Sequence, residues 1–502
     1  MNYIQGTPRD QLVMFQNHLD EMICKNSPVR FIDEYVENLD LEKIGFQIPQ
    51  LNTGRPPYNP KLMLKIYIYC YLEKIRSSRK MENECSRNQE LIWLTCNLTP
   101  DFKTIADFRK DNKAGLLGIF KDFLLFCKEL DLFSLEIAAV DGTKMRGQNG
   151  LNEVYNRNTI DNVQAKIEKK IKEYLQELDE NDNNDSGELK LDKEKVTKLL
   201  ERLKKLQKRK KKVIEIKRKF VSNPNLDTYF ATDPDTRFQS DKGKVRPGYN
   251  PQIGTEGKNN LIIVNEVTNQ SNDLKQVTPM KEKIRKVKKE LDIKEKTNIL
   301  FDAGYDSEKS ILENKNDTEN IPLIQDKKVA ARKNDKSGRN KKKKNRLPHE
   351  AFEKAAFKYI IEKDEYECPA GRRLKKKGGM KKDKNNRDVF VYKCQDCRDC
   401  NHQDKCTSSK TGRMLKVSAH ESEIEEYKNW IKTKENKKYL SRRKEMVEHP
   451  FGILKRNWGF TYFMQRGIES VRAEFGFMSF IYNLKRVINI VGAKQLIRTL
   501  TT

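Results

Sequence analysis

Two mostly apolar runs in the middle of the chain each end in an aspartate. The first, Leu135–Val140, is followed by Asp141 and Gly142, and the second, Ile299–Phe301, is followed by Asp302. Short apolar runs bounded by turn-forming residues are typical of buried strands whose last residue emerges at the edge of a sheet. We therefore expect Asp141 and Asp302 to lie at the ends of two strands.

Further strand signals surround these two runs. Leu261–Val267 is a strong one, Pro247–Asn250 leads into another, and Ile321–Ile324 is weaker. A stretch with helical spacing, near residues 280–291, separates them. Strands that alternate with helices in this way predict an α/β fold.

Helical periodicity occupies two other regions. From about 61 to 110, apolar residues recur at helical spacing in short segments, which predicts an all-helical N-terminal domain over 1–130. The rest of the chain, 131–502, would form the second domain. Between about 152 and 220 the helical spacing continues on both sides of a polar gap at 179–187. This pattern predicts an antiparallel helical hairpin inserted into the second domain.

A second insertion is expected over 327–436. It begins with a lysine-rich segment and contains five of the ten cysteines, namely Cys368, Cys394, Cys397, Cys400 and Cys406. Closely spaced thiolates can converge on one tetrahedral, structural Zn²⁺. Because five cysteines exceed four ligand positions, two interpretations stay open: a zinc site, or a thiol-rich loop without metal.

The charge balance points to a polyanionic partner. Lys and Arg total 101 against 73 Asp and Glu, for a formal net charge of +28. Nucleic acid accounts for such an excess; a solvated basic surface is the alternative. The sequence has neither a secretion signal nor an apolar run of about 18 residues, so we expect no membrane association. A cytoplasmic protein follows, with cysteines that are thiols or metal ligands.

Three acids form the candidate catalytic constellation. Asp141 and Asp302 end their strands, where ligands collect in open α/β sheets. A third acid, Glu448, lies in a predicted long helix, seven residues before Lys455. At that spacing two helical side chains share one face, which would place a carboxylate and an ammonium together. Three carboxylates can hold two Mg²⁺ or Mn²⁺ ions roughly 4 Å apart for phosphodiester cleavage and transfer.

Several motifs also carry a resemblance. The catalytic ones are Asp141-Gly142-Thr143-Lys144, Asp302-Ala303-Gly304-Tyr305 and Glu448 with Lys455. Others are Arg55-Pro56-Pro57-Tyr58, Ile75-Arg76-Ser77-Ser78-Arg79, Thr104-Ile105-Ala106-Asp107-Phe108-Arg109, Thr232-Asp233-Pro234-Asp235, Gly248-Tyr249-Asn250-Pro251-Gln252, Phe451-Gly452 and Tyr482-Asn483-Leu484-Lys485-Arg486. Through these residues the chain resembles the DDE insertion-sequence transposases of bacteria.

The resemblance implies a ribonuclease H-like mixed sheet with helical insertions, preceded by an N-terminal helical DNA-binding domain. It also implies DNA transposition, with Asp141, Asp302 and Glu448 as the catalytic, metal-binding residues. Double-stranded DNA, both element terminal repeats and target, would be the partner of a homo-oligomer associated with the bacterial nucleoid. Basic residues near the three acids would contact this DNA: Lys144, Arg442, Arg443 and Lys455.

One departure from the family pattern concerns the helix that carries Glu448. Many relatives have Tyr-x-x-Arg-x-x-x-Glu, whereas here Ser441 and Lys444 fill the Tyr and Arg positions. We expect this difference to affect contacts with DNA and not metal binding. Two alternative functions are a metal-dependent nuclease without strand transfer and a catalytically inactive DNA-binding repressor of the element.

Overall fold

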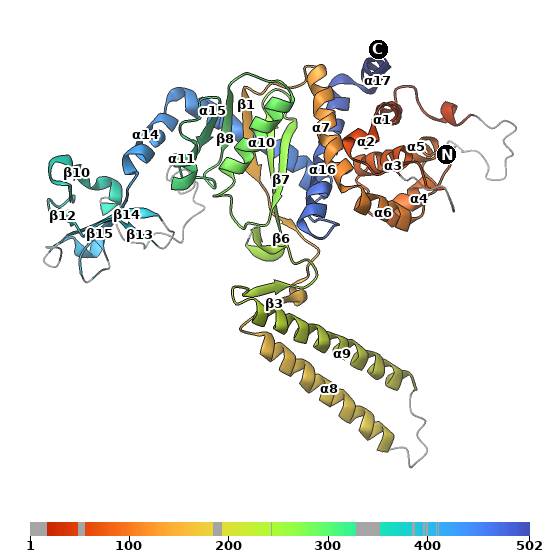
Figure 1. The fold of residues 1–502 in the computed structure, drawn as a ribbon, viewed down its shortest axis with the longest axis horizontal. Helices are drawn as coiled ribbons and strands as arrows, with labels where there is room; N and C mark the ends of the chain where they lie inside the picture. Colours follow the sequence, from red (N-terminus) through yellow and green to blue (C-terminus); the bar gives the residue numbers. More distant parts are fainter. Residues whose placement is uncertain are drawn as a thin grey trace, which may run out of the picture.

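The computed structural model describes residues 18–48, 56–183, 193–241, 243–327, 352–383, 387–394, 397, 400–407, 409 and 411–501. The molecule is elongated, with a central sheet between a group of N-terminal helices and a second, smaller sheet (Figure 1). A helical hairpin projects from the central part. The α/β fold class predicted from the sequence is confirmed, because long helices and mixed sheets occur together.

The central sheet contains both aspartate-terminated strands. Its five principal strands are β1 (Ile137–Gly142), β6 (Lys244–Glu256), β7 (Ile262–Thr268), β8 (Thr297–Phe301) and β9 (Asn320–Ile324). They lie in the order β7-β6-β1-β8-β9, with β6 antiparallel to both of its neighbours, β7 and β1, and with β1, β8 and β9 parallel. Two short strands, β2 (Met145–Arg146) and β5 (Arg237–Asp241), pair with the first half of β6.

Two helices cover opposite faces of this sheet. Val140 of β1 and Ile284, which lies on α10 (Val277–Glu290), both border Gly254. Asp141, the residue after Val140, contacts Arg443 of α15 (Lys434–Phe451). Because successive strand residues point to opposite faces, α10 and α15 lie on different sides. The end of β1 therefore presents Asp141 toward α15. A short helix, α11 (Glu308–Asn314), follows β8.

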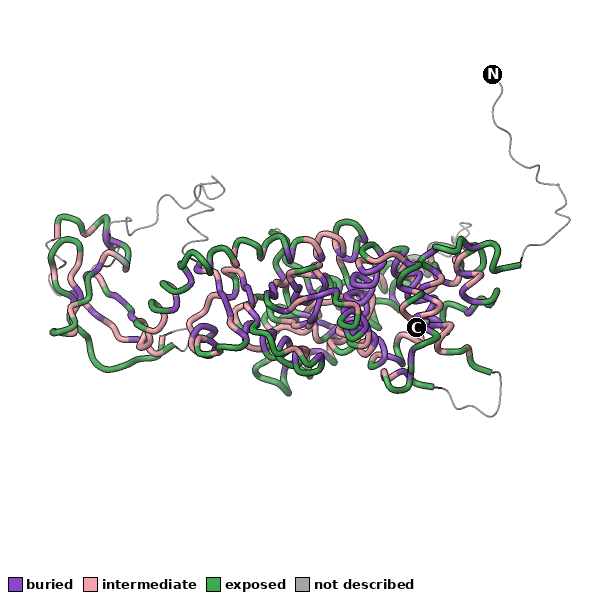
Figure 2. The backbone as a smooth tube through the Cα atoms, turned by 90° about the horizontal axis from the view of Figure 1, so that it is seen from above, coloured by how far each residue is buried: buried purple, intermediate pink, exposed green. Residues whose placement is uncertain are grey.

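The N-terminal helices share one continuous hydrophobic core with the sheet. They are η1 (Leu19–Met22), α1 (Pro28–Glu37), α2 (Leu41–Ile44), α3 (Pro60–Leu72), α4 (Ser78–Cys85), α5 (Gln89–Leu94), α6 (Phe102–Asp111) and α7 (Lys113–Glu129). The long helix α16 (Ile468–Val491) packs on α7 and α3 as well as on β7, and α17 (Ala493–Thr501) packs on α1. Figure 2 shows buried positions concentrated in this part of the molecule.

The hairpin consists of α8 (Ile160–Asn183) and α9 (Lys193–Ser222). It is joined to the central part through η2 (Leu151–Glu153) and a two-stranded ladder of β3 (Val154–Asn156) and β4 (Thr228–Phe230). Its base has a separate hydrophobic cluster, formed by Tyr155, Ile160, Ile167, Val213, Ile216 and Phe220. The hairpin therefore packs mainly on itself and projects from the sheet (Figure 1).

The smaller sheet contains the cysteine-rich segment. Its strands are β10 (Lys358–Ile360), β11 (Glu365–Glu367), β12 (Arg373–Lys376), β13 (Lys381–Lys382), β14 (Asp388–Cys394) and β15 (Met414–Ser418). Short helices η5 (Lys354–Ala356), η6 (Ile361–Lys363) and α13 (Gln403–Cys406) accompany them, and α14 (Glu421–Ile431) leads back to α15. Most of the predicted lysine-rich segment, residues 328–351, lies outside the described residues. We call residues 352–418 the small unit.

Candidate active site

Asp141 occupies a half-buried position at the carboxyl end of β1, with its side chain 26% exposed. Its Oδ1 accepts a hydrogen bond from the Gly142 N–H at 2.8 Å, and its Oδ2 lies 3.3 Å from Nη1 of Arg443. Burial raises the pKa of Asp141 to about 6; Arg443 acts in the opposite direction, and the nearby Asp302 raises it further. A carboxylate that is costly to ionise and faces a second carboxylate is typical of sites that take a cation.

The parallel pairing of β1 and β8 brings Asp302 next to Asp141. Ala139 pairs with Leu300, so the same register continued by two residues places the two aspartates side by side on one face. Oδ1 of Asp302 accepts a hydrogen bond from the Gly304 N–H at 2.7 Å. The structure thus brings together the first two of the three predicted acids.

Glu448 is not placed with them. Its side chain is 65% exposed and forms an ion pair with Lys444 one turn earlier, at 3.6 Å. The buried face of α15, next to the sheet, carries Met446 and Val447 instead. Within the described part of the chain, no three His, Cys, Asp or Glu side chains are arranged as a ligand set for a metal ion.

Lys455 contacts residues just after β1, and the sequence did not predict these contacts. Its ammonium donates hydrogen bonds to Oγ1 of Thr143 at 2.9 Å and to the carbonyl of Lys144 at 3.1 Å. The expectation that Lys455 and Glu448 share a face of one α-helix is wrong, because α15 gives way to a π-helix, η7 (Gly452–Asn457). Pro450 has no N–H to donate to the preceding turn, and the wider turn that begins nearby changes the direction of later side chains.

The other predicted DNA-contacting residues make intramolecular contacts at this site. Arg443 pairs with Asp141, and Nη2 of Arg442 donates to the carbonyl of Gly257 at 3.1 Å. Nζ of Lys144 lies 3.6 Å from Asp273, and burial lowers the pKa of this lysine. Arg443, Lys144 and Lys455 therefore lie around the carboxyl end of β1, with much of their charge directed inward. Arg442 instead contacts Gly257, which lies beside the start of that strand.

Asp273 is a residue that sequence reasoning missed. It lies in the loop after β7, and its Oδ1 accepts hydrogen bonds from Nδ2 of Asn250 at 2.7 Å and from Nε2 of Gln252 at 2.8 Å. The available signal was in β6, where Asn250 and Gln252 are polar residues two apart in a run that is otherwise mostly apolar and buried. Such residues need a polar partner, because unpaired buried amides are costly.

Tyr305 connects this network to the two strand-terminal aspartates. Its hydroxyl donates a hydrogen bond to Oε1 of Gln252. Burial raises the pKa of Tyr305 well above its ordinary value, and Asp141, Asp273 and Asp302 act in the same direction. Three carboxylates therefore lie within electrostatic range of one buried tyrosine, which makes Asp273 part of the candidate site.

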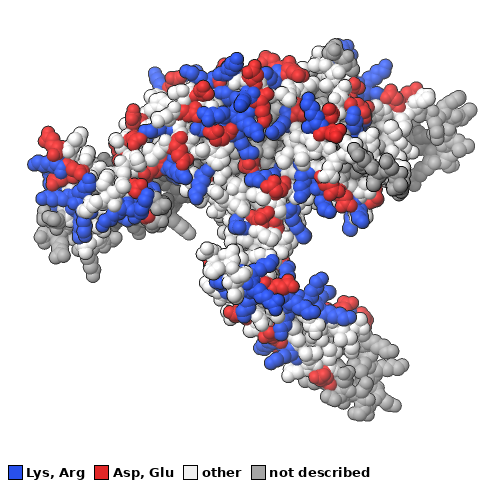
Figure 3. Space-filling view, in the orientation of Figure 1, with Lys and Arg blue, Asp and Glu red and all other residues white. Residues whose placement is uncertain are grey.

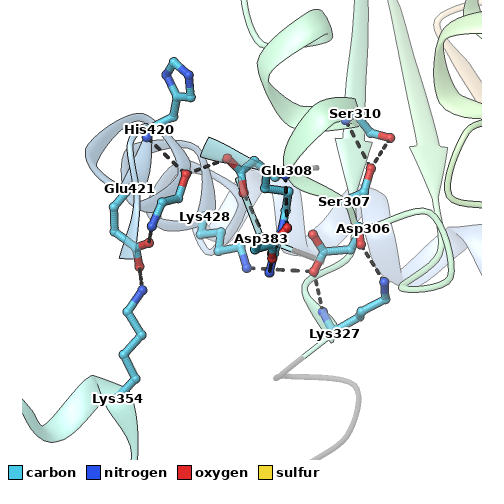
Figure 4. Close-up of polar contacts among 12 residues, drawn as sticks. Asp306, Ser307, Glu308, Ser310, Lys327, Lys354, Asp383, His420, Glu421 and Lys428 are labelled. Carbon is cyan, nitrogen blue, oxygen red and sulfur yellow. Dashed lines mark hydrogen bonds and ion pairs between the residues drawn. The ribbon is translucent and has the colours of Figure 1, made fainter. Parts of the chain in front are cut away.

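A polar network links the turn after Asp302 to the small unit (Figure 4). The N–H of Lys327 donates to Asp306 at 3.0 Å, and Nζ of Lys428, on α14, lies 3.8 Å from the same carboxylate. Oγ of Ser418 donates to Oε1 of Glu308. Asp306 is therefore engaged in contacts that hold segments together, although it is only four residues from Asp302.

Comparison with known families finds two matches. Residues 17–111, which include α1 to α6, match a family described as a transposase domain (DUF772). Residues 367–488, which include Glu448 and Lys455, match a transposase DDE domain. Asp141 and Asp302 lie outside both matched segments, and neither a curated protein nor a solved structure matches the chain.

Both matches are to transposase families. Taken together, they support an insertion-sequence DDE transposase, so the family predicted from the motifs is confirmed. The DDE match indicates an enzyme that acts on DNA, in a family that generally uses divalent metal ions. None of the helices in the described residues is both long enough and apolar enough to cross a membrane.

Proposed function

We propose that this protein catalyses DNA transposition by cleaving DNA at the ends of an insertion sequence and joining those ends to target DNA. The observation that carries the proposal is the pair of aspartates at the carboxyl ends of the parallel strands β1 and β8. One of them, Asp141, is half-buried, and its pKa of about 6 reflects the loss of solvent around it and the second carboxylate. A divalent cation would remove the cost of keeping both carboxylates ionised.

We further propose that the central sheet is a ribonuclease H-like core. The strand order β7-β6-β1-β8-β9, with three antiparallel strands followed by two parallel ones, supports this assignment. In such a sheet the first and fourth principal strands are neighbours, so that residues far apart in sequence meet at one edge. We also propose the division made from the sequence, 1–130 for DNA binding and 131–502 for catalysis, with one hydrophobic core shared between the two parts.

The donor set fits a hard divalent cation. Asp141 and Asp302 supply carboxylate oxygens, which Mg²⁺ and Mn²⁺ prefer. Two such ions, when bound, would activate the attacking hydroxyl and stabilise the leaving oxygen of a phosphodiester. Glu448 is the proposed third ligand, because it lies within the matched DDE segment and on the helix that packs against β1 and β8.

The basic residues of the site are proposed to hold DNA. Arg443 neutralises Asp141 at 3.3 Å, and a cation bound by the carboxylates would free its guanidinium for a phosphate. Lys455 and Lys144 lie beside the end of β1, where a scissile phosphate would have to approach. Arg442 is proposed as a further contact on the same helix. Double-stranded DNA, bound by a homo-oligomer, is the proposed partner.

A plasmid assay tests this function. The full-length protein should nick or linearise supercoiled plasmid carrying the element ends in Mg²⁺ and leave it intact in EDTA. Pre-cut element ends with free 3′-hydroxyls should then be joined to a target plasmid. Cleavage without joining would identify a nuclease, and binding without either reaction would identify an inactive DNA-binding protein.

A further inference from the structure

Four cysteines of the small unit surround one small cavity. They are Cys368 before β12, Cys397 and Cys400 after β14, and Cys406 at the end of α13. The cavity has a volume of about 20 Å³, which is room for a single small ion or water. Because the four thiols come from three separate segments, only the fold brings them together. We call this site the thiol cavity.

Electrostatic coupling also indicates that the four sulfurs are close neighbours. Burial raises the pKa of the Cys406 thiol, and Arg413 acts in the opposite direction. The thiols of Cys397, Cys368 and Cys400 each raise that pKa further. The fifth cysteine of the segment, Cys394, does not line the cavity.

Two turns at the cavity direct backbone N–H groups at sulfur. The Arg372 N–H donates to Sγ of Cys368 at 3.2 Å across a tight turn in which Gly371 has a φ of +74°. The Arg413 N–H approaches Sγ of Cys397 at 3.5 Å, next to Gly412, which has a φ of +95°. Hydrogen bonds of this kind stabilise thiolate more than thiol, and ligands of bound metals commonly receive them.

Positive charge is available to balance a metal–thiolate group. Four thiolates and one Zn²⁺ carry a net charge of −2, and Arg372 and Arg413 are among the residues that line the cavity. Nε of Arg413 is buried and has no hydrogen-bond partner among the residues that the structure describes. An anionic centre in the cavity would give this donor an electrostatic partner.

The small unit also lacks a core large enough to hold it together. Its hydrophobic cluster has ten buried members among the described residues, three of which are cysteines, and it is separate from the main core. Units of fewer than roughly 70 to 80 residues commonly need a disulfide or a metal ion for stability. All five cysteines of the unit are free thiols in the structure.

We propose that the four cysteines of the thiol cavity bind one structural zinc ion. Tetrahedral zinc with four thiolates is a closed site with no open position for substrate, so its role is to hold the small unit together. In the structure the thiols surround the cavity without forming a completed ligand set. Inward rotation of the cysteine side chains would complete it, and the binding free energy would then add to the folding free energy of this unit.

Cys394 provides the matched control. It lies in β14, opposite Leu374 of β12, and its side chain is 1% exposed in the hydrophobic cluster. It belongs to the same segment as the proposed ligands and is more buried than any of them, because Cys397 and Cys406 are 9% exposed and Cys368 and Cys400 are only half-buried. Five cysteines could in principle supply the four zinc ligands. Because Cys394 does not line the cavity, we assign the ligands to the other four.

Metal analysis of the full-length protein tests the proposal. The protein is purified without chelators, and zinc per chain is measured for the wild type and for Cys397→Ala, Cys406→Ala and Cys394→Ala. The expected result is about one zinc per chain in the wild type and in Cys394→Ala, with loss of most zinc in the other two. Absence of zinc from the wild type, or equal loss in Cys394→Ala, would overturn the proposal.

A second measurement does not depend on the variants folding. The wild-type protein is treated with a strong chelator, and hydrogen exchange is followed by mass spectrometry. Residues 352–418 should lose protection, while the central sheet keeps it, because the two regions have separate hydrophobic clusters. Unchanged exchange in the small unit after zinc removal would contradict a structural role. Addition of Co²⁺ to the zinc-free protein should produce the visible absorption spectrum of cobalt in tetrahedral thiolate coordination.

Discussion

At the scale of single residues, the cost of burying Asp141 is the central electrostatic feature. Loss of solvent raises the pKa of Asp141 to about 6, and Arg443 only partly offsets this effect. The protein therefore holds an acid that is poorly satisfied in the absence of a cation. This is the arrangement expected where function, and not stability, selects the residue.

The first prediction follows from the raised pKa of Asp141. Because this pKa is about 6 when folded and near 3.8 when unfolded, the folded state binds more protons between these pH values. The free energy of unfolding should therefore fall as pH rises from about 4 to about 6. In EDTA at pH 7, Asp141→Asn should be more stable than wild type by about 2 to 3 kcal/mol. Denaturant titrations at pH 4 and pH 7 measure this difference.

The control for this prediction is Asp131→Asn, because the Asp131 side chain is 90% exposed. This substitution should change stability by less than about 0.5 kcal/mol at either pH. If Asp141→Asn is less stable than wild type at pH 7, the ion pair with Arg443 outweighs the cost of burial, and the electrostatic description of the site is wrong.

A second buried charge cluster joins the N-terminal helices to α16. Glu474 is fully buried and accepts hydrogen bonds from the N–H groups of Met464 and Gln465 at 2.9 and 3.0 Å. Nη1 of Arg76 lies 3.5 Å from the same carboxylate, and its guanidinium stacks on the Phe460 ring at 4.4 Å. Arg76 therefore belongs to the packing of the molecule, although it lies in a motif shared with transposases.

The second prediction concerns this pair. Arg76→Ala removes one of the two arginines that offset the charge of the buried Glu474, while Arg109 and the two backbone N–H groups remain, so it should lower the free energy of unfolding by about 1.5 to 3 kcal/mol. Lys80→Ala, an exposed position on the neighbouring helix α4, should change it by less than about 0.5 kcal/mol. Urea denaturation of both variants makes the comparison, and equal effects would mean that Arg76 has no special structural role.

At the scale of elements, the hairpin α8–α9 is the most independent part of the chain. Its hydrophobic cluster at the base is closed by ion pairs, including Lys210 with Glu168 at 2.9 Å. The third prediction is that residues 169–209 can be replaced by a short Gly/Ser linker without loss of the central fold. The melting temperature should change little, because no described residue of the removed part belongs to the main hydrophobic core. Aggregation of the shortened protein would show that the hairpin tip supports folding.

The elements that could be predicted are those with strong local patterns. Asp141 and Asp302 were found because apolar runs precede them, and strand register then accounts for their proximity. Asp273 could not be found in this way, since it lies in an irregular loop and its partners Asn250 and Gln252 belong to an earlier strand. The assumption of regular α-helical spacing also gave the wrong direction for the Lys455 side chain. The spacing of apolar residues in the sequence does not reveal the π-helix that follows Pro450.

The pairing of Arg76 with Glu474 illustrates a further limit. The two residues lie 398 positions apart, and no local pattern connects them. A motif that is shared with a family does not reveal whether its arginine faces DNA or a buried glutamate. Only the packing of α16 against the N-terminal helices decides between these roles.

At the scale of the whole molecule, the excess positive charge is unevenly distributed. On the face shown in Figure 3, Lys and Arg gather on the hairpin and on the small unit. The fourth prediction is a steep negative slope of log affinity against log salt for DNA binding, because a basic protein releases condensed counterions from phosphates. Filter-binding titrations between low and physiological salt measure the slope, and a flat dependence would exclude a large phosphate-binding surface.

Matched substitutions on α9 test whether the hairpin contributes to this slope. Lys208, Arg209 and Lys211 are exposed, whereas Lys212 pairs with Glu153 at 2.6 Å. If the hairpin lies on DNA, alanine at the three exposed positions should reduce the steepness of the slope by about 0.9 for each phosphate that is no longer neutralised. Lys212→Ala should leave the slope nearly unchanged. Equal slopes in all variants would assign the binding surface to other parts of the molecule.

The most direct test of the central claim is DNA end cleavage in Mg²⁺ by amide variants of the three acids. Asp141→Asn, Asp302→Asn and Glu448→Gln should each abolish cleavage, because a neutral amide replaces an anionic ligand of a hard cation. Gel-shift affinity should stay near that of the wild type, since binding rests on many phosphate contacts. Asp306→Asn, which alters only the contacts with Lys327 and Lys428, should still cleave. Wild-type cleavage by Asp302→Asn would contradict the proposed active site.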